Sequence, residues 1–300
     1  MAKVVVTGGA GFIGCHLVDA LLERGDEVHV LDTLAEGRRE DRINAHAIYH
    51  DVDIRDYNQV GARMMNAKRV FHLAALPRVQ YSIENPRETH DVNVNGTFTV
   101  LRAAYDTGVK RVIYSASSSA YGMSERMPLS EDNPTAPMSP YAAQKLMAEI
   151  LCQTWYRTYG LETVCLRYFN VYGPRLDPNG PYALVMGIFL RQWLAGEPFT
   201  ITGDGMQTRD FTHVSDVVRA NILASESLLV GNGEVINIGA GRSVTINDLA
   251  KMFGGPVTYI APRLEPKQTL ADIRRAKALL GWEPTIRLCE GIDKLKLLNS

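Results

Sequence analysis

Short runs of apolar and β-branched residues alternate with helical patterns through the first half of the 300-residue chain. Buried strands are indicated by KVVVTG, EVHVLD, AIYHDVD, RVFHLAA and RVIYSAS. Between these runs, helical patterns cover residues 11–24, 56–65 and 89–107. Strands that alternate with helices need crossover connections. The pattern therefore predicts an α/β fold, in which helices cover both faces of a parallel sheet.

The pattern is less regular after the segment TVCLRYFNVYGP. Residues 175–182 are rich in Pro, Gly and Asn and predict a loop. The later segments predict helices over 183–195 and 216–229, a turn at PFTITGDG, a strand at EVINIG, a short helix near Asp248 and a last helix over 271–280. The C-terminal third is thus expected to be smaller and less regular than the rest.

This change in regularity predicts two domains. We expect residues 1–169 to form the larger domain, and the segment of about 213–238 to return to it. Residues 170–212 and 239–300 are then expected to form a smaller α/β domain that covers the open end of the sheet.

Composition and charge exclude several classes of protein. Hydrophobic residues make up 46% of the chain and charged residues 22%, which are ordinary globular values. The net charge is -1, so no basic excess points to nucleic acid or an anionic membrane as a partner. No apolar run approaches the ~20 residues of a membrane helix, and no signal peptide is recognisable. The cysteines Cys15, Cys152, Cys165 and Cys289 form no C-x-x-C pair, so we expect no metal site and a cytoplasmic location.

Glycines follow the first predicted strand at a spacing suited to a dinucleotide. Gly8, Gly11 and Gly14 give G-x-x-G-x-x-G, and Gly9 with the last two also gives G-x-G-x-x-G. Such a turn lets backbone approach a pyrophosphate at a helix N-terminus. Asp32 ends the second strand, where a carboxylate binds a ribose diol and repels a 2′-phosphate. We therefore expect a Rossmann-type doubly wound sheet that binds NAD.

A second group of residues has the chemistry of a general base. In SPYAAQK, Tyr141 and Lys145 are four residues apart, and Ser139 and Pro140 are suited to begin a helix that carries both. An ammonium beside a phenol is expected to lower its pKa and make it a better base. Upstream, YSASSSAYG places Ser115, Ser117, Ser118 and Ser119 at a strand end, where ligands of parallel sheets bind.

Seven segments, in order along the chain, carry a family resemblance. They are TGGAGFIG, HLAA, NVNGT, SSSAYG, SPYAAQK, RYFNVYGPR and GDGMQTRDF. With them the chain resembles the extended short-chain dehydrogenase/reductases, specifically their sugar-nucleotide 4-epimerase branch, from Val4 to about Pro284. The resemblance implies that the larger domain binds NAD, which is held tightly and regenerated in each cycle. It also implies that the smaller domain binds a UDP-sugar and that the protein is a homodimer.

The resemblance also implies roles for individual residues. The cofactor-binding positions would be Gly8, Gly11, Phe12, Ile13, Gly14, Asp32, Gly37, Asp53, Ile54, Leu73, Ala74, Ala75, Asn93, Ser115, Tyr141, Lys145 and Tyr168. The catalytic residues would be Ser117, Tyr141 and Lys145. The substrate-binding positions would be Ser117, Ser118, Ser119, Tyr141, Asn170, Val185, Arg209, Arg263 and Thr269.

The family hosts several reactions, so the site residues must decide between them. Dehydratases that resemble this chain carry an Asp and a Glu beside the catalytic hydroxyl, where this chain has Ser118 and Ser119. We therefore expect a 4-epimerase that acts through a transient 4-keto sugar. By the resemblance, the small side chain of Thr269 leaves room for an N-acetyl group, so UDP-N-acetylglucosamine is expected as a substrate besides UDP-glucose. A related dehydratase or reductase, or a nucleotide-binding scaffold without turnover, remain the alternatives.

Overall fold

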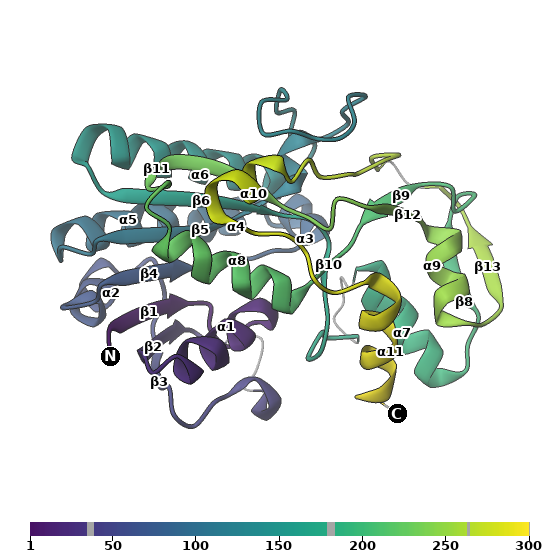
Figure 1. The fold of residues 1–300 in the computed structure, drawn as a ribbon, viewed down its shortest axis with the longest axis horizontal. Coiled ribbons are helices and arrows are strands. Elements are labelled where there is room, and N and C mark those ends of the chain that lie inside the picture. Colours follow the sequence, from purple (N-terminus) through teal and green to yellow (C-terminus); the bar gives the residue numbers. More distant parts are fainter. Residues whose placement is uncertain (35–38, 179–183, 263–264, 300) are drawn as a thin grey trace.

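The protein is described from a computed structural model that covers residues 1–34, 39–178, 184–262 and 265–299. Its centre is a parallel seven-stranded sheet in the order β11-β6-β5-β4-β1-β2-β3 (Figure 1). The strands are β1 (Lys3–Thr7), β2 (Glu27–Asp32), β3 (Ile48–Asp51), β4 (Arg69–His72), β5 (Arg111–Ser117), β6 (Glu162–Tyr168) and β11 (Asn232–Ile238). Strand order reverses between β1 and β4, and ligands of such sheets bind at the carboxyl ends beside this point.

Helices cover both faces of this sheet, because apolar side chains alternate along its strands. In β1, Val4 and Val6 face one core and Val5 faces the other. The first core is covered by α1 (Phe12–Glu23), α8 (Val214–Glu226) and α10 (Arg274–Leu280). The second is covered by α2 (Tyr57–Met64), α5 (Thr97–Asp106) and α6 (Pro140–Tyr159). The predicted doubly wound α/β fold is confirmed.

The helical pattern of residues 89–107 is more divided than the sequence suggests. After α3 (Val79–Glu84), the short α4 (Pro86–His90) leads into a π-helical segment, Asp91–Gly96, and only then into α5. A Cβ on Gly96 would lie 2.6 Å from the Ile54 side chain, so this close approach requires a glycine. The wider turn also leaves Asn93 free to reach the strand ends, as described below.

The strands and helices that follow β6, apart from α8, β11 and α10, build a smaller layered region beside the large sheet (Figure 1). Its strands form three pairs: β7 (Val171–Tyr172) with β10 (Thr212–His213), β9 (Thr208–Asp210) with β12 (Ser243–Thr245), and β8 (Phe199–Thr202) with β13 (Val257–Ile260). Its helices are α7 (Val185–Ala195), α9 (Ile246–Phe253) and α11 (Leu288–Leu297). Phe199 and Ile201 pack with Phe189 and Phe253 in a separate apolar core.

Two expectations for this region need correction. PFTITGDG is not simply a turn: its first half is strand β8, because Phe199 and Ile201 alternate with threonines and face the core, and the turn starts only at Gly203. The helix α11 was not expected at all. Both elements are stabilised by contacts with residues distant in the sequence, such as Phe253. The local sequence therefore gave little indication of them. In the described part of the chain, no helix is long and apolar enough to cross a membrane.

Candidate active site

The first turns of α6 hold the predicted tyrosine–lysine pair. The Ser139 hydroxyl accepts a hydrogen bond from the Ala142 N–H at 3.2 Å, and Pro140 occupies the first turn, as expected for a helix start. Tyr141 and Lys145 follow on one face, and the Lys145 Nζ lies 6.0 Å from the centre of the Tyr141 ring. The same Nζ donates a hydrogen bond of 2.8 Å to the Ser115 carbonyl oxygen at the end of β5.

Ser117 completes this group at the carboxyl end of β5. Its Oγ accepts hydrogen bonds from the N–H of Ser119 at 3.2 Å and from the Ser119 hydroxyl at 2.9 Å. These two bonds leave the Ser117 proton free to be donated, and Ser117 lies close enough to the Tyr141 hydroxyl to favour its deprotonation. The structure therefore brings Ser117, Tyr141 and Lys145 together.

The electrostatics of the pair differ from the sequence expectation. Burial raises the pKa of Tyr141, while the hydrogen bond from Ser117 and the charge of Arg78 oppose that rise. The net direction is thus opposite to the expected lowering, because burial outweighs the charges nearby. Burial also lowers the pKa of Lys145 to about 8, and the carboxylate of Glu149 opposes this change. The Lys145 ammonium is directed to the sheet rather than to the phenol.

The glycine turn between β1 and α1 is closely packed. Gly8 has a φ of +71°, and a Cβ there would lie 2.6 Å from the Ala74 backbone nitrogen. No side chain caps α1, whose N-cap is Gly11, so the first-turn N–H groups of Phe12, Ile13 and Gly14 are oriented as in an anion site. A pyrophosphate needs free N–H groups at a helix start and a turn without side chains that would block its approach. The uncapped start of α1 and the glycine turn provide both, so these residues fit NAD.

Asp32 lies next to this turn, at the end of β2. One carboxylate oxygen accepts a hydrogen bond from the Ala10 N–H at 3.0 Å, and the other accepts one from the Leu34 N–H at 2.9 Å. The carboxylate is thereby fixed beside the glycine turn, in agreement with a ribose-binding role. Gly37 lies outside the described residues.

The other predicted cofactor residues fall into three groups. Asn93 hydrogen-bonds both the N–H and the carbonyl of Leu76, at 2.8 and 3.2 Å, and so holds the chain that follows Leu73, Ala74 and Ala75. Asp53 is bound by Arg55, which also pairs with Asp91 at 2.8 Å, and Ile54 is buried. The Tyr168 hydroxyl accepts a hydrogen bond of 3.0 Å from Ser115 and contacts Asn221, inside a buried network.

His72 is a buried residue of this site that sequence reasoning missed. Thr97 donates its proton to the Asn93 carbonyl at 2.7 Å, so the His72 Nε2 must donate to Thr97, 3.0 Å away. Its Nδ1 then accepts from Thr7 at 2.7 Å. Burial lowers the pKa of His72 to about 3, so the ring is neutral. The histidine in HLAA, placed on a buried strand, was the available signal.

Three of the predicted substrate residues lie in the smaller region. Asn170, Val185 and Arg209 line a cavity of about 300 Å³, together with Phe211 and Glu265 among others. Arg209 is 9% exposed and pairs with Glu265 at 2.5 Å, so Glu265 is a polar site residue that sequence reasoning missed. Its nearness to the Arg209 strand depends on tertiary structure and is not visible in the local pattern.

Four further substrate positions have different outcomes. The Thr269 hydroxyl accepts a hydrogen bond from the Asp210 N–H at 3.3 Å, and the Thr269 N–H donates to the Thr208 carbonyl at 3.1 Å. Thr269 is thus fixed beside β9, the strand of Arg209, but it does not line the cavity. Arg263 lies outside the described residues. Ser118 and Ser119 begin a 3₁₀ turn after β5.

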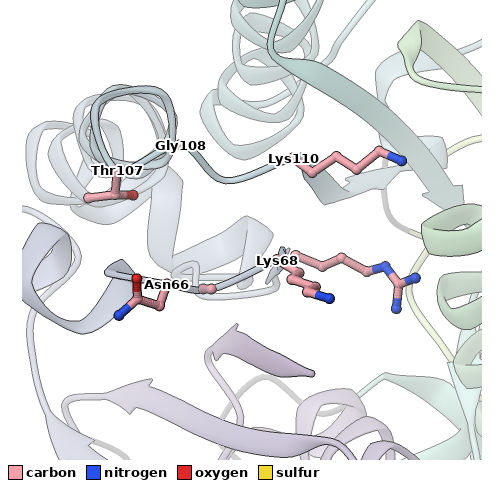
Figure 2. Close-up of a pocket in the computed structure, with 7 residues that line it drawn as sticks. Asn66, Lys68, Thr107, Gly108 and Lys110 are labelled. Atoms are coloured by element: carbon pink, nitrogen blue, oxygen red, sulfur yellow. The ribbon is translucent and has the colours of Figure 1, made fainter. Parts of the chain in front are cut away.

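A second cavity, of about 620 Å³, lies at the opposite, amino end of the sheet. Figure 2 shows Lys68 and Lys110, which precede β4 and β5 and line this cavity. Asn66, Thr107 and Gly108 also line it. Ligands of open parallel sheets bind at the carboxyl ends of the strands, so the candidate site is the one around Tyr141. Within the described residues, no three His, Cys, Asp or Glu side chains gather as a metal site would require.

Comparison with known proteins confirms the resemblance. Residues 4–239 match the model of the NAD dependent epimerase/dehydratase family. The chain is 38% identical over 301 residues to a putative UDP-glucose 4-epimerase of Methanocaldococcus jannaschii, covering 97% of this chain and 96% of the relative.

Solved structures agree with this assignment. A UDP-glucose 4-epimerase of Thermotoga maritima, solved with UDP-glucose, is 39% identical with a TM-score of 0.93 and covers 98% of this chain and 97% of its own. A UDP-N-acetylglucosamine 4-epimerase of Methanobrevibacter ruminantium M1, solved with UDP-N-acetylmuramic acid, is 37% identical with a TM-score of 0.93. This match covers 99% of this chain and 97% of that structure's chain. These matches span nearly all of both chains. The chain therefore belongs to the NAD dependent epimerase/dehydratase family.

Proposed function

We propose that the protein is an NAD-dependent 4-epimerase of UDP-hexoses. It interconverts UDP-glucose and UDP-galactose, and also UDP-N-acetylglucosamine and UDP-N-acetylgalactosamine. The observation that carries the proposal is the group of Ser117, Tyr141 and Lys145 at the carboxyl end of β5, with Ser118 and Ser119 beside it. Serines there provide a hydrogen-bonding site but no acid–base pair that could eliminate water from the sugar.

In this proposal the chain's own groups move the proton of the sugar 4-hydroxyl. Bound NAD, held by the turn from Gly8 to Gly14 and by Asp32, would accept and return the hydride of carbon 4. Tyr141, as its phenolate, removes the hydroxyl proton as general base, and the neighbouring Ser117 favours that phenolate. Lys145 contributes positive charge one helical turn away. The flat 4-keto sugar then turns its other face to the site before Tyr141 returns the proton.

The nucleotide of the substrate is proposed to bind in the cavity near α7. Arg209 supplies a guanidinium for the diphosphate, and Asn170, Val185 and Arg263 complete the binding positions. In the structure Glu265 neutralises Arg209, so a diphosphate would replace that carboxylate as the partner of the guanidinium. Arg209 is almost fully buried and therefore already fixed in place.

Acceptance of N-acetyl sugars is proposed to depend on Thr269. Its hydroxyl is bound to the Asp210 backbone, so its small side chain is held beside the Arg209 strand. A bulky ring in its place would fill the space that a 2-acetamido group needs. The relative rates with the plain and acetylated sugars measure this dependence directly.

Product mass separates the proposed reaction from its alternatives. Purified protein with NAD is incubated with UDP-glucose, and the nucleotide sugar is recovered for mass spectrometry and chromatography. An epimerase changes retention but not mass, a dehydratase removes one water, and a reductase changes the mass by two hydrogens. A scaffold changes neither. A product that has lost water would replace this proposal with the dehydratase.

We further propose a homodimer formed through α5 and α6, and a cytoplasmic location. The two helices pack together through Phe98 against Trp155 and Tyr105 against Tyr159, with ring centres 5.1 and 5.2 Å apart. Yet Phe98 is 48% exposed and Ile150 is 53% exposed, which leaves an apolar face for a second copy. Ile150→Glu should convert the dimer to a monomer in light scattering. A chain that is monomeric before the change would refute the dimer, and cell fractionation tests the location.

A further inference from the structure

Glu149 lies on α6 in line with the proposed catalytic pair. Tyr141, Lys145 and Glu149 are spaced by four residues and therefore share one face of the helix. Glu149 forms a bidentate ion pair with Arg167 of β6, with nitrogen–oxygen distances of 2.9 and 2.7 Å. The two side chains are only 2% and 4% exposed. The guanidinium of Arg167 also stacks over the Tyr121 ring, 4.6 Å from its centre.

Such a pair is not needed for stability as such. Two charges lose their hydration when buried, and replacing a buried pair with apolar residues is often neutral or stabilising. The Arg167 Nη1 also has no hydrogen-bond partner, so the arrangement is not fully satisfied. The position of the pair beside Lys145 is therefore its more informative property.

The surroundings of Lys145 are otherwise poor in negative charge. The side chain is 4% exposed, and its Nζ has the Ser115 carbonyl of β5 as hydrogen-bond acceptor. The Tyr114 ring of β5 faces it at 5.0 Å, and the neutral His72 of β4 also lies near enough to be affected by its charge. On α6 itself, Tyr141 lies one turn before Lys145, with its ring centre 6.0 Å from the Lys145 Nζ.

Two groups counteract the effect of burial on Lys145. The carboxylate of Glu149 is the stronger and the thiol of Cys152 the weaker, and both raise the pKa of the lysine against the lowering by burial. The interaction is mutual: burial raises the pKa of Glu149, and Arg167 and, more weakly, the charge of Lys145 oppose that rise. Glu149 is thus the principal group that favours an ammonium at this position.

We propose that Glu149, held in place by Arg167, is a positioning residue that keeps Lys145 charged and directed to the Ser115 carbonyl during the reaction. This rests on the proposed function, in which Lys145 must act as a cation beside Tyr141. Glu149 itself touches neither the sugar nor the cofactor in this account. Its effect reaches the reaction only through Lys145.

The test compares two buried glutamates. Glu149→Gln removes the carboxylate beside Lys145, whereas Glu131→Gln is the matched control. Glu131 is also buried, lies 3.7 Å from Arg275, and has its pKa raised by burial. In a plot of kcat against pH, Glu149→Gln should shift the alkaline limb to lower pH by about one unit, as expected when Lys145 loses one nearby opposite charge. Glu131→Gln should leave that limb unchanged.

A second variant and a second readout keep the inference independent of folding and of the substrate. Glu149→Gln with Arg167→Met removes both charges and avoids an unpaired buried guanidinium. NMR of ¹³Cε-labelled lysine, with the Lys145 signal assigned by Lys145→Arg, then gives the titration midpoint of Lys145 directly. It should fall by about one pH unit in both Glu149 variants. An unchanged midpoint in either folded variant overturns the inference, whereas a wild-type protein without turnover overturns only the proposed function.

Discussion

Replacing Gly14 by alanine should damage the nucleotide site, whereas the same change at Gly61 should not. Both glycines lie inside helices, Gly14 in α1 and Gly61 in α2. A Cβ on Gly14 would lie 2.8 Å from the Cα of Gly9 and closer still to the carbonyl oxygen of Gly8. A Cβ on Gly61 would meet nothing within 4 Å. Comparing the two variants therefore separates the effect of close packing at Gly14 from the effect of replacing a helical glycine by alanine.

The magnitudes follow from these distances. Carbon atoms pack at about 3.5 Å, so the Gly9 contact alone requires Gly14→Ala to displace the turn by roughly 0.7 Å, and the closer Gly8 oxygen requires more. Overpacking of this kind costs about 1–3 kcal/mol of stability. Gly61→Ala instead should gain about 0.5–1 kcal/mol, because alanine is the better helix former. Because the displaced backbone is the proposed pyrophosphate cradle, we also expect NAD affinity to fall by at least about tenfold, or 1.4 kcal/mol.

Urea unfolding and a fluorescence titration with NAD measure the two effects separately. Unfolding gives the stability of each variant, and the titration gives the dissociation constant for NAD. Gly61→Ala should bind NAD as the wild type does, which controls for the added methyl group. A Gly14→Ala protein with wild-type stability and wild-type NAD affinity would show that the turn is not the tight cradle described above.

Four other changes test the rest of the site. Tyr141→Phe should lower kcat by at least ~10²-fold in steady-state kinetics while NAD binding persists; a near-normal rate would remove Tyr141 from the mechanism. Arg209→Met should weaken UDP binding by calorimetry at least about tenfold, and unchanged binding would place the diphosphate elsewhere. Thr269→Tyr should impair turnover of UDP-N-acetylglucosamine selectively, and equal loss on UDP-glucose would contradict the size argument. His72 has its pKa lowered by burial from 6.5 to about 3, so the unfolded chain binds a proton that the folded chain does not as pH falls from 6.5 towards 3. Stability should therefore decline over that window, and His72→Gln should flatten the decline in acid unfolding curves.

Local signals predicted the large sheet and its ligand edge well. The strands of the first half are parallel neighbours, and the inner ones, such as β1 and β5, are buried on both faces, so their apolar runs are unambiguous. The start of α6 was equally predictable. Ser139 as N-cap, the Ala142 N–H that it accepts from, and Pro140 in the first turn all lie within four residues of sequence. The same holds for the turn at Gly8, which only a residue without a Cβ can form there.

What the sequence could not supply depends on contacts between distant residues. Glu265 is 56 residues from Arg209, and no local pattern pairs them. The rise in the pKa of Tyr141 comes from burial by the whole fold, whereas its spacing from Lys145 suggested a lowering. Strand β8 was missed because its glycine-containing end masks a two-residue alternation that is stabilised by Phe253. The division into 1–169 with 213–238, and 170–212 with 239–300, stays a prediction.

The most direct test of the central claim is a ¹H NMR time course of UDP-glucose with the purified protein and NAD. The proposed function predicts that the anomeric signal of UDP-galactose appears and that the two sugars reach the same ratio from either side. UDP-N-acetylglucosamine should behave likewise. If both sugars remain unchanged while Tyr141 and NAD are intact, 4-epimerisation of these UDP-hexoses is contradicted.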